Sequence, residues 1–138
     1  MEALTRERFK YKKSKYLVYA REKFSEDGKL VIRSALGKNI NTFKKREWLV
    51  NNIKGIGYKE ASHFLRNIGF GSDIAILDRH ILRTLKSIKV IDEISESLSK
   101  KKYLTIEEKM RNFSKDIKIP MDHLDLLFWY REKGEVFK

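Results

Sequence analysis

Apolar positions along most of the chain recur at intervals of three and four residues, the spacing of one face of an α-helix. In residues 11–24, Tyr16, Leu17, Ala20 and Phe24 share one face, and the opposite face is basic. Similar patterns predict helices over residues 30–36, 43–52, 58–67, 79–88, 99–113 and 120–134. One proline and seven glycines leave few interruptions in 138 residues. The predicted fold class is therefore all-α, a helical bundle with short loops.

Residues at the predicted helix ends support these boundaries. Asp78 and Ser99 stand where an N-cap side chain is preferred, and Pro120 stands where a helix starts. Gly37 and Gly69 follow helices, as expected of residues that end them. Residues 25–28 read as a turn, and the apolar run 74–77 also fits a short strand.

Composition narrows the classes of function. The chain has no cysteine, which excludes disulfides, Cys-ligated zinc and thiol nucleophiles. No apolar run approaches the roughly 18 residues that span a bilayer, and residues 1–9 do not fit a signal peptide. A soluble cytoplasmic protein is expected. The formal net charge of +12 indicates a polyanionic partner, of which nucleic acid is favoured. The alternatives are an anionic membrane and a Lys-rich surface typical of heat-adapted proteins.

A glycine hairpin joins two of the predicted helices. Gly55 and Gly57 flank Ile56, and glycine tolerates the positive φ of such a turn. The amides of Gly57 and Tyr58 would then lie open at a helix N-terminus, where phosphate binds. An ordinary turn between two helices would give the same pattern.

A lysine and an aspartate follow this hairpin at helix starts. Lys59 opens the helix after the hairpin, and Asp78 opens the next one. The stretches 53–61 (IKGIGYKEA) and 76–81 (ILDRHI) resemble the hairpin and the catalytic-aspartate segment of the helix-hairpin-helix–Gly/Pro–Asp superfamily of DNA glycosylases. The run GYKEASH and the C-terminal tail are similar to those of the archaeal type 2 8-oxoguanine DNA glycosylases.

The resemblance implies a bifunctional DNA glycosylase and abasic-site lyase that excises 8-oxoguanine in base excision repair. Lys59 would attack the sugar's anomeric carbon and form a Schiff base, after which β-elimination nicks the strand. A positive helix N-terminus and partial burial disfavour the ammonium form, which suits a lysine that must lose its proton. Asp78 would stay ionised, stabilise the cationic sugar and assist proton transfer. For Lys59 the alternative is a phosphate contact, and for Asp78 it is a plain N-cap, which is compatible with catalysis.

The resemblance also assigns base recognition and a cation. Trp129 would stack on the oxidised base, the α-carboxylate of Lys138 would read its edge, and Phe9 would form a further aromatic wall. Trp129 also fits an ordinary core position. No cofactor is required, but the family's hairpin often holds a monovalent cation through main-chain carbonyls, here those of Asn51, Ile53 and Ile56.

Other candidate residues receive simpler interpretations. His63 and His80 lack a carboxylate–histidine cluster and are expected to be structural or to contact DNA. Basic residues on the DNA side are expected to face phosphates in part: Lys12, Lys13, Lys15 and Arg79. The run 100–102 is read as a solvated helix face.

The expected organisation is one domain over residues 1–138. It holds a helix-hairpin-helix at about 43–67, the catalytic-aspartate segment at about 74–88 and a base-reading tail at about 120–138. Most members of the superfamily begin with several more helices, whereas the match here starts near Phe9. An exposed apolar flank is therefore expected. The chain is interpreted either as a truncated or split member or as a minimal variant that closes its core by other means, such as self-association. The alternative functions are a non-catalytic helix-hairpin-helix module that binds DNA and a related glycosylase for another damaged base.

Overall fold

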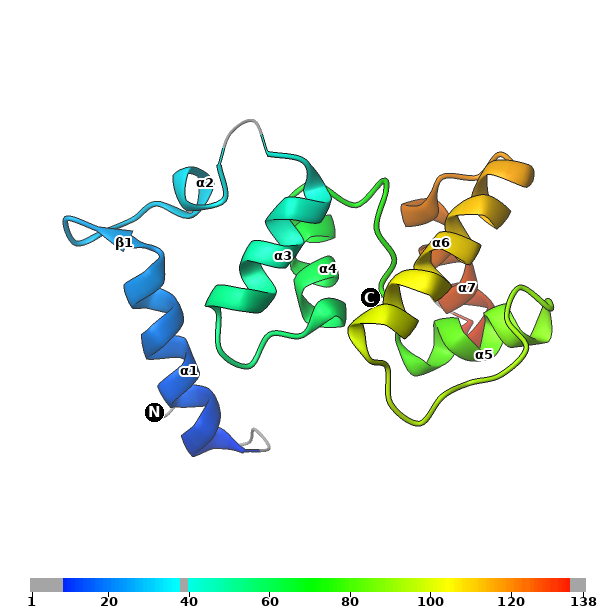
Figure 1. The fold of residues 1–138 in the computed structure, drawn as a ribbon, viewed down its shortest axis with the longest axis horizontal. Coiled ribbons are helices and arrows are strands. Elements are labelled where there is room, and N and C mark those ends of the chain that lie inside the picture. The colour runs from blue at the N-terminus through cyan, green and yellow to red at the C-terminus, as the bar shows by residue number, and fades with distance from the viewer. Residues whose placement is uncertain (1–8, 38–39, 135–138) are drawn as a thin grey trace. The chain divides into compact units, whose positions relative to one another are not determined.

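The computed structural model describes residues 9–37 and 40–134, and most of them are helical (Figure 1). They form two compact units, Met1–Gly57 and Tyr58–Lys138. The expectation of a single domain stays a prediction, because compactness alone does not say whether either unit folds independently. Among the described residues, no helix combines the length and the apolar character needed to cross a membrane.

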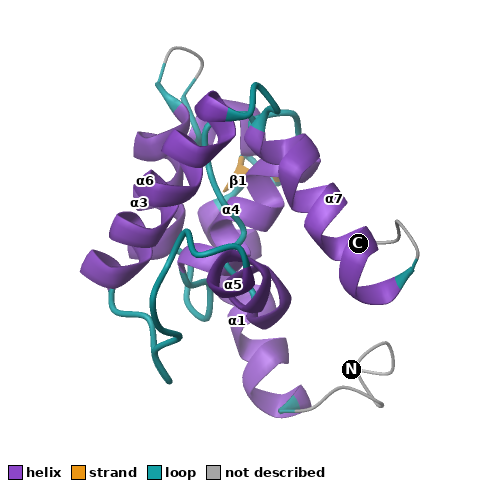
Figure 2. Cartoon of the chain, turned by 90° about the vertical axis from the view of Figure 1, so that its right-hand side faces the viewer, coloured by secondary structure: helices purple, strands orange, loops and turns teal. Residues whose placement is uncertain are grey.

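Within its described residues, the first unit contains three helices and one small hairpin. Its elements are α1 (Lys10–Lys23), β1 (Ser25–Glu26), β2 (Lys29–Leu30), α2 (Ile32–Ala35) and α3 (Thr42–Asn52). Figure 2 colours the strands orange. The structure corrects two predictions here. The predicted turn 25–28 is confined to residues 27–28, because residues 25–26 form β1, and the helix predicted over 30–36 begins at Ile32 because Leu30 pairs with Ser25.

Helix α1 packs against the turn that follows α3. The Tyr16 ring lies so close to Gly55 that a Cβ at Gly55 would stand 2.4 Å from it. Gly55 also has φ of 84°, in the left-handed region that favours glycine. Nearby, the Lys54 ammonium lies 4.5 Å from the centroid of the Tyr19 ring. The close approach of the Tyr16 ring and the positive φ together explain why glycine occupies position 55.

Part of α1 remains exposed. Tyr11, Leu17 and Val18 are exposed apolar residues on this helix. Their exposure agrees with the expected apolar flank.

As far as residue 134, where the description ends, the second unit contains four helices around one core. Its elements are α4 (Tyr58–Asn67), α5 (Arg79–Ser87), α6 (Lys100–Asp116) and α7 (Met121–Lys133), and α7 contacts both α5 and α6 (Figure 1). The core residues come from all the elements after α4: Ala75, Leu77, Ile81, Leu82, Leu85, Ile91, Tyr103, Ile106, Met110, Met121, Leu124 and Phe128. The helix predictions in this unit are confirmed to within a few residues at each end.

The apolar run 74–77 is neither strand nor helix. Its four residues are buried and form an irregular segment that leads into α5. A short strand was a plausible interpretation because apolar runs of this length do not identify their secondary structure.

Candidate active site

Lys59 lies in the first turn of α4. Its side chain is 47% exposed, and its Nζ lies 3.4 Å from Oε1 of Glu60. The Glu60 carboxylate pairs with the charged ammonium form. Lys59 must therefore leave this carboxylate and lose its proton before it can act as a nucleophile.

Asp78 is the N-cap of α5, as predicted. Its Oδ1 accepts hydrogen bonds from the backbone N–H groups of His80 and Ile81, each at 2.9 Å. Both bonds hold this oxygen at the N-terminus of α5, the positive end of the helix dipole. The side chain is partly buried, so its charge is less screened by water than that of a fully exposed aspartate.

Tyr103 of α6 contacts both the start of α4 and the segment before α5. Its ring lies 5.4 Å from the Tyr58 ring, and its Oη lies 3.4 Å from Oγ of Ser62. The same Oη donates to the carbonyl of Ala75 at 2.7 Å and accepts from the N–H of Leu77 at 3.3 Å. Tyr103 is thus the side chain that joins these two parts of the second unit.

These contacts reach the immediate neighbours of both predicted catalytic residues. Tyr58 precedes Lys59, and Leu77 precedes Asp78. A residue next to the lysine and a residue next to the aspartate therefore contact one shared side chain. The sequence did not single out Tyr103 for this role, because its apolar spacing marks it only as a core position.

Trp129 lies on α7 and packs against α5. Its ring centroid is 5.1 Å from that of His80, with the two rings at 86° in an edge-to-face arrangement. Trp129 is partly buried. His80 follows Asp78 by two residues, so this contact brings α7 close to the N-terminus of α5.

A second connection joins α4 to α7. Arg66 and Asp125 form an ion pair through Nη1 and Oδ2, and their side chains are only 13% and 3% exposed. Gly71 is packed against Arg66, because a Cβ at Gly71 would lie 2.5 Å from Arg66 Cγ. The loop between α4 and α5 is therefore fixed to the same pair.

The predicted phosphate site lies around the turn before α4. Gly57 is exposed and directly precedes Tyr58, the first residue of α4. The carbonyls predicted to hold a cation lie at the end of α3, where the helix dipole favours positive charge. The Ile53 carbonyl accepts a hydrogen bond of 3.3 Å from Ile56 N–H, and its second lone pair suits a cation. Carbonyl oxygens are the hard donors that alkali cations require, so these residues fit the predicted ion.

The remaining predicted residues are Phe9, Lys138 and four basic residues. Phe9 is 66% exposed and caps the start of α1 in the first unit. Lys138 lies outside the described residues. The four basic residues expected near phosphates, Lys12, Lys13, Lys15 and Arg79, are all exposed, as phosphate contact requires.

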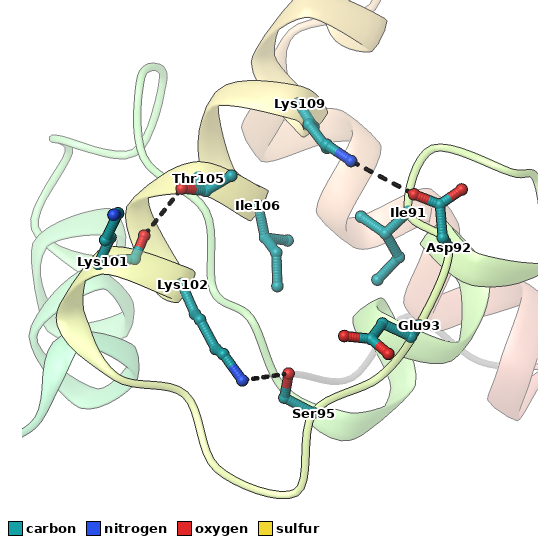
Figure 3. Close-up of a pocket in the computed structure, with 9 residues that line it drawn as sticks. All are labelled: Ile91, Asp92, Glu93, Ser95, Lys101, Lys102, Thr105, Ile106 and Lys109. Carbon is teal, nitrogen blue, oxygen red and sulfur yellow. Dashed lines mark hydrogen bonds and ion pairs between the residues drawn. The ribbon is translucent and has the colours of Figure 1, made fainter.

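A hollow beside α6 offers a different kind of site. Its volume is about 450 Å³, and its lining includes Lys101, Lys102, Lys109 and the carboxylates of Asp92 and Glu93 (Figure 3). No aromatic side chain belongs to its described lining. A base turned out of DNA needs flat walls, so this hollow does not suit it. The described residues also contain no group of three His, Asp or Glu side chains arranged to hold a metal ion.

Comparison with known protein families gives one clear match. The family model described as 8-oxoguanine DNA glycosylase matches residues 1–119. A Fusobacterium nucleatum protein named 8-oxoguanine DNA glycosylase/AP lyase is 56% identical over 138 residues, which are 100% of this chain and 64% of the relative. A Methanocaldococcus jannaschii protein of the same name is 46% identical over 131 residues, 95% of this chain and 60% of the relative. The chain spans less than two thirds of the length of these curated relatives.

Solved structures agree with these relatives. The crystal structure of the M. jannaschii 8-oxoguanine DNA glycosylase has a TM-score of 0.86 at 45% identity, covering 99% of this chain and 62% of that one. The M. jannaschii glycosylase/lyase in complex with a 15mer DNA containing 8-oxoguanine has a TM-score of 0.83 at 45% identity, covering 95% and 60%. The all-α fold containing a helix-hairpin-helix is therefore confirmed.

Proposed function

Because the chain belongs to the 8-oxoguanine DNA glycosylase family, we propose that it is a DNA glycosylase and abasic-site lyase that excises 8-oxoguanine in base excision repair. The observation that carries the proposal is the arrangement around Tyr103. A lysine and an aspartate begin two helices of one compact unit, and the residue next to each contacts the same tyrosine. A DNA-binding module without catalysis needs neither of these residues.

The proposed chemistry starts at Lys59. Its neutral amine attacks C1′ of the damaged nucleotide, the C1′–N9 bond breaks, and the base leaves with a proton. Opening of the sugar ring then gives a Schiff base between Lys59 and C1′. Loss of a proton from C2′ breaks the C3′–O3′ bond, and hydrolysis of the remaining imine frees the lysine.

Asp78 is proposed to act throughout by charge. The sugar carries positive charge in the excision step, and an ionised carboxylate at the start of α5 stabilises it. The backbone N–H groups of His80 and Ile81 hold Oδ1, so the carboxylate needs little reorganisation during the reaction. Asp78 also accepts and returns protons in the later steps.

The partner is double-stranded DNA that contains a damaged base. Gly55, Gly57 and Tyr58 are proposed to contact phosphate, and Trp129, Phe9 and Lys138 to recognise the base. A monovalent cation at the carbonyls of Asn51, Ile53 and Ile56 would strengthen the phosphate contact without entering the chemistry. The proposed substrate places the protein with chromosomal DNA in the cytoplasm.

Product analysis on a panel of damaged duplexes tests the proposal. Each duplex carries one lesion: 8-oxoguanine, a uracil, an alkylated adenine or an abasic site. The expected result is release of free 8-oxoguanine together with strand cleavage at the same position. Undamaged duplex of the same sequence is the control.

Other results on this panel would identify the alternatives. Excision of a different base, with 8-oxoguanine left intact, would reassign the substrate within the same superfamily. Salt-sensitive binding of undamaged duplex with no product from any lesion would overturn the enzymatic proposal and favour a binding module.

A further inference from the structure

The buried segment 74–77 needs hydrogen-bond partners that it cannot find in a sheet or a helix. Each buried backbone N–H or C=O group that stays unpaired costs about 1–3 kcal/mol. One bond is internal, from Asp78 N–H to the Ile76 carbonyl at 2.8 Å. Side chains of α6 supply others.

Three residues of α6 bind this segment and the residue before it. Tyr103 Oη bonds to the Ala75 carbonyl and the Leu77 N–H, and Glu107 Oε1 accepts from Ala75 N–H at 2.8 Å. Arg111 Nη2 donates to the Asp73 carbonyl at 2.8 Å. Glu107 is only 2% exposed. A glutamate is seldom buried to this extent unless its carboxylate has partners to bind.

The spacing of these three side chains along α6 explains why each of them binds a different part of the segment. Tyr103, Glu107 and Arg111 are four residues apart, so each lies about 6 Å further along the helix than the one before. One face of α6 therefore meets alternate residues of the segment, 77, 75 and 73 in turn.

Arg111 also pairs with two glutamates of the same helix. Its Nη2 lies 3.4 Å from Glu107 Oε2, and its Nη1 pairs with Glu108. The Glu107 carboxylate thus binds backbone through one oxygen and the Arg111 guanidinium through the other. Each contact restricts the rotamer of its neighbour.

We infer that Tyr103, Glu107 and Arg111 are positioning residues that set the place of Asp78 relative to Lys59. The inference rests on the proposed function, since it assigns these residues to the same reaction. Tyr103 fixes Leu77, which precedes Asp78, and its ring packs on Tyr58, which precedes Lys59. Removal of the Tyr103 hydroxyl leaves the ring contact in place but removes the hydrogen bonds to the Ala75 carbonyl and the Leu77 N–H.

Single-turnover excision tests the inference. Tyr103→Phe is compared with wild type and with Ile106→Val, a core variant on the same helix that loses a methyl group and no hydrogen bond. Assays run well below the unfolding temperature of every variant. The expected result for Tyr103→Phe is a fall of roughly tenfold or more in the maximal rate, with half-saturation unchanged within about twofold, because small displacements of reacting groups are costly. Ile106→Val keeps its rate within about twofold.

Glu107 provides a second pair of variants. Glu107→Gln retains an oxygen that can accept from Ala75 N–H, whereas Glu107→Leu has none. We expect Glu107→Gln to react several-fold faster than Glu107→Leu at the same temperature. Equal rates for the two variants, an unchanged rate in Tyr103→Phe, or a loss in Tyr103→Phe that Ile106→Val shares would overturn the inference.

Amide hydrogen exchange separates this inference from the proposed function. In Tyr103→Phe, the Leu77 and His80 amides should exchange at least several-fold faster than in wild type, while amides in the middle of α7 keep their protection. Unchanged exchange at Leu77 would contradict the inference even if the enzyme excises 8-oxoguanine. An inactive wild type with faster exchange in the variant would instead contradict the proposed function alone.

Discussion

At the scale of single residues, Asp78 combines a structural role with the proposed catalytic one. Its carboxylate caps α5, and capping uses hydrogen bonds that an uncharged asparagine can also accept. Stabilisation of a sugar cation requires the negative charge itself. Substitutions at this residue can therefore separate the two roles.

Asp78→Asn should keep the fold and lose the reaction. We expect its free energy of unfolding to stay within about 0.5 kcal/mol of wild type, whereas Asp78→Ala loses the cap and about 1 kcal/mol. Both variants should excise 8-oxoguanine at least about a hundredfold more slowly. Denaturant unfolding measures the effect on stability, and single-turnover kinetics measure the effect on excision. An Asp78→Asn variant that keeps its excision rate would contradict the proposed role of the negative charge.

Gly55 offers a test of the turn before α4. Gly55→Ala meets the Tyr16 ring in addition to adopting a positive φ, whereas Gly28→Ala has a similar φ of 75° and no atom within 4 Å of its Cβ. The Gly28 variant should cost about 1–2 kcal/mol, and the Gly55 variant distinctly more. Thermal unfolding of both variants measures the difference. Equal losses of stability in the two variants would show that the Tyr16 ring moves aside at no cost in free energy.

Local signals made several of these residues predictable. Asp78 and Ser99 were identified as N-caps because an N-cap binds amides only two or three residues away. Tyr103 was not identified as a positioning residue, because its partner Leu77 is 26 residues distant in sequence. The catalytic roles of Lys59 and Asp78 came from a family resemblance and remain predictions.

At the scale of elements, helices with strong periodicity were predicted well and short irregular pieces were not. The limits of α4 matched the sequence prediction because Tyr58 follows a glycine turn and Gly69 ends the helix. The ladder between β1 and β2 was missed, since two-residue strands are too short to show alternation. The ion pair between α4 and α7 was also beyond sequence reasoning, because Arg66 and Asp125 are 59 residues apart.

The Arg66–Asp125 pair predicts a strong coupling between α4 and α7. Asp125→Ala should lower the free energy of unfolding by about 3–5 kcal/mol, because it leaves a nearly buried guanidinium without this partner. Arg66→Met combined with Asp125→Leu should recover much of that loss, since neither charge then remains. Chemical denaturation of Arg66→Met, of Asp125→Leu and of the double variant gives the coupling energy. If the loss of stability in the double variant equals the sum of the losses in the two single variants, the two side chains do not act as a pair.

At the scale of the whole molecule, charge and fold support the same kind of partner. A net charge of +12 attracts DNA phosphates, and the family to which the chain belongs acts on DNA according to its name. Charge by itself did not specify the reaction, since the same excess would serve a binding module. The proposed catalytic roles of Lys59 and Asp78 in the second unit are what separate the two functions.

Salt dependence should reveal how many phosphates the protein contacts. The logarithm of the affinity for duplex DNA should fall linearly with the logarithm of salt concentration, with a slope of about −3 or steeper. Lys13→Gln should reduce the magnitude of this slope by about one if Lys13 contacts phosphate. Fluorescence anisotropy titrations measure both, and a slope near zero would exclude an electrostatic DNA interface.

The most direct test of the central claim is covalent trapping with borohydride on a duplex that contains 8-oxoguanine. The account predicts one protein–DNA adduct, mapped by mass spectrometry to the peptide that carries Lys59. Lys59→Gln should abolish this adduct, whereas Lys115→Gln, which removes a charge from an exposed face of α6, should retain it. A wild type that forms no adduct, or an adduct that persists in Lys59→Gln, would contradict the account.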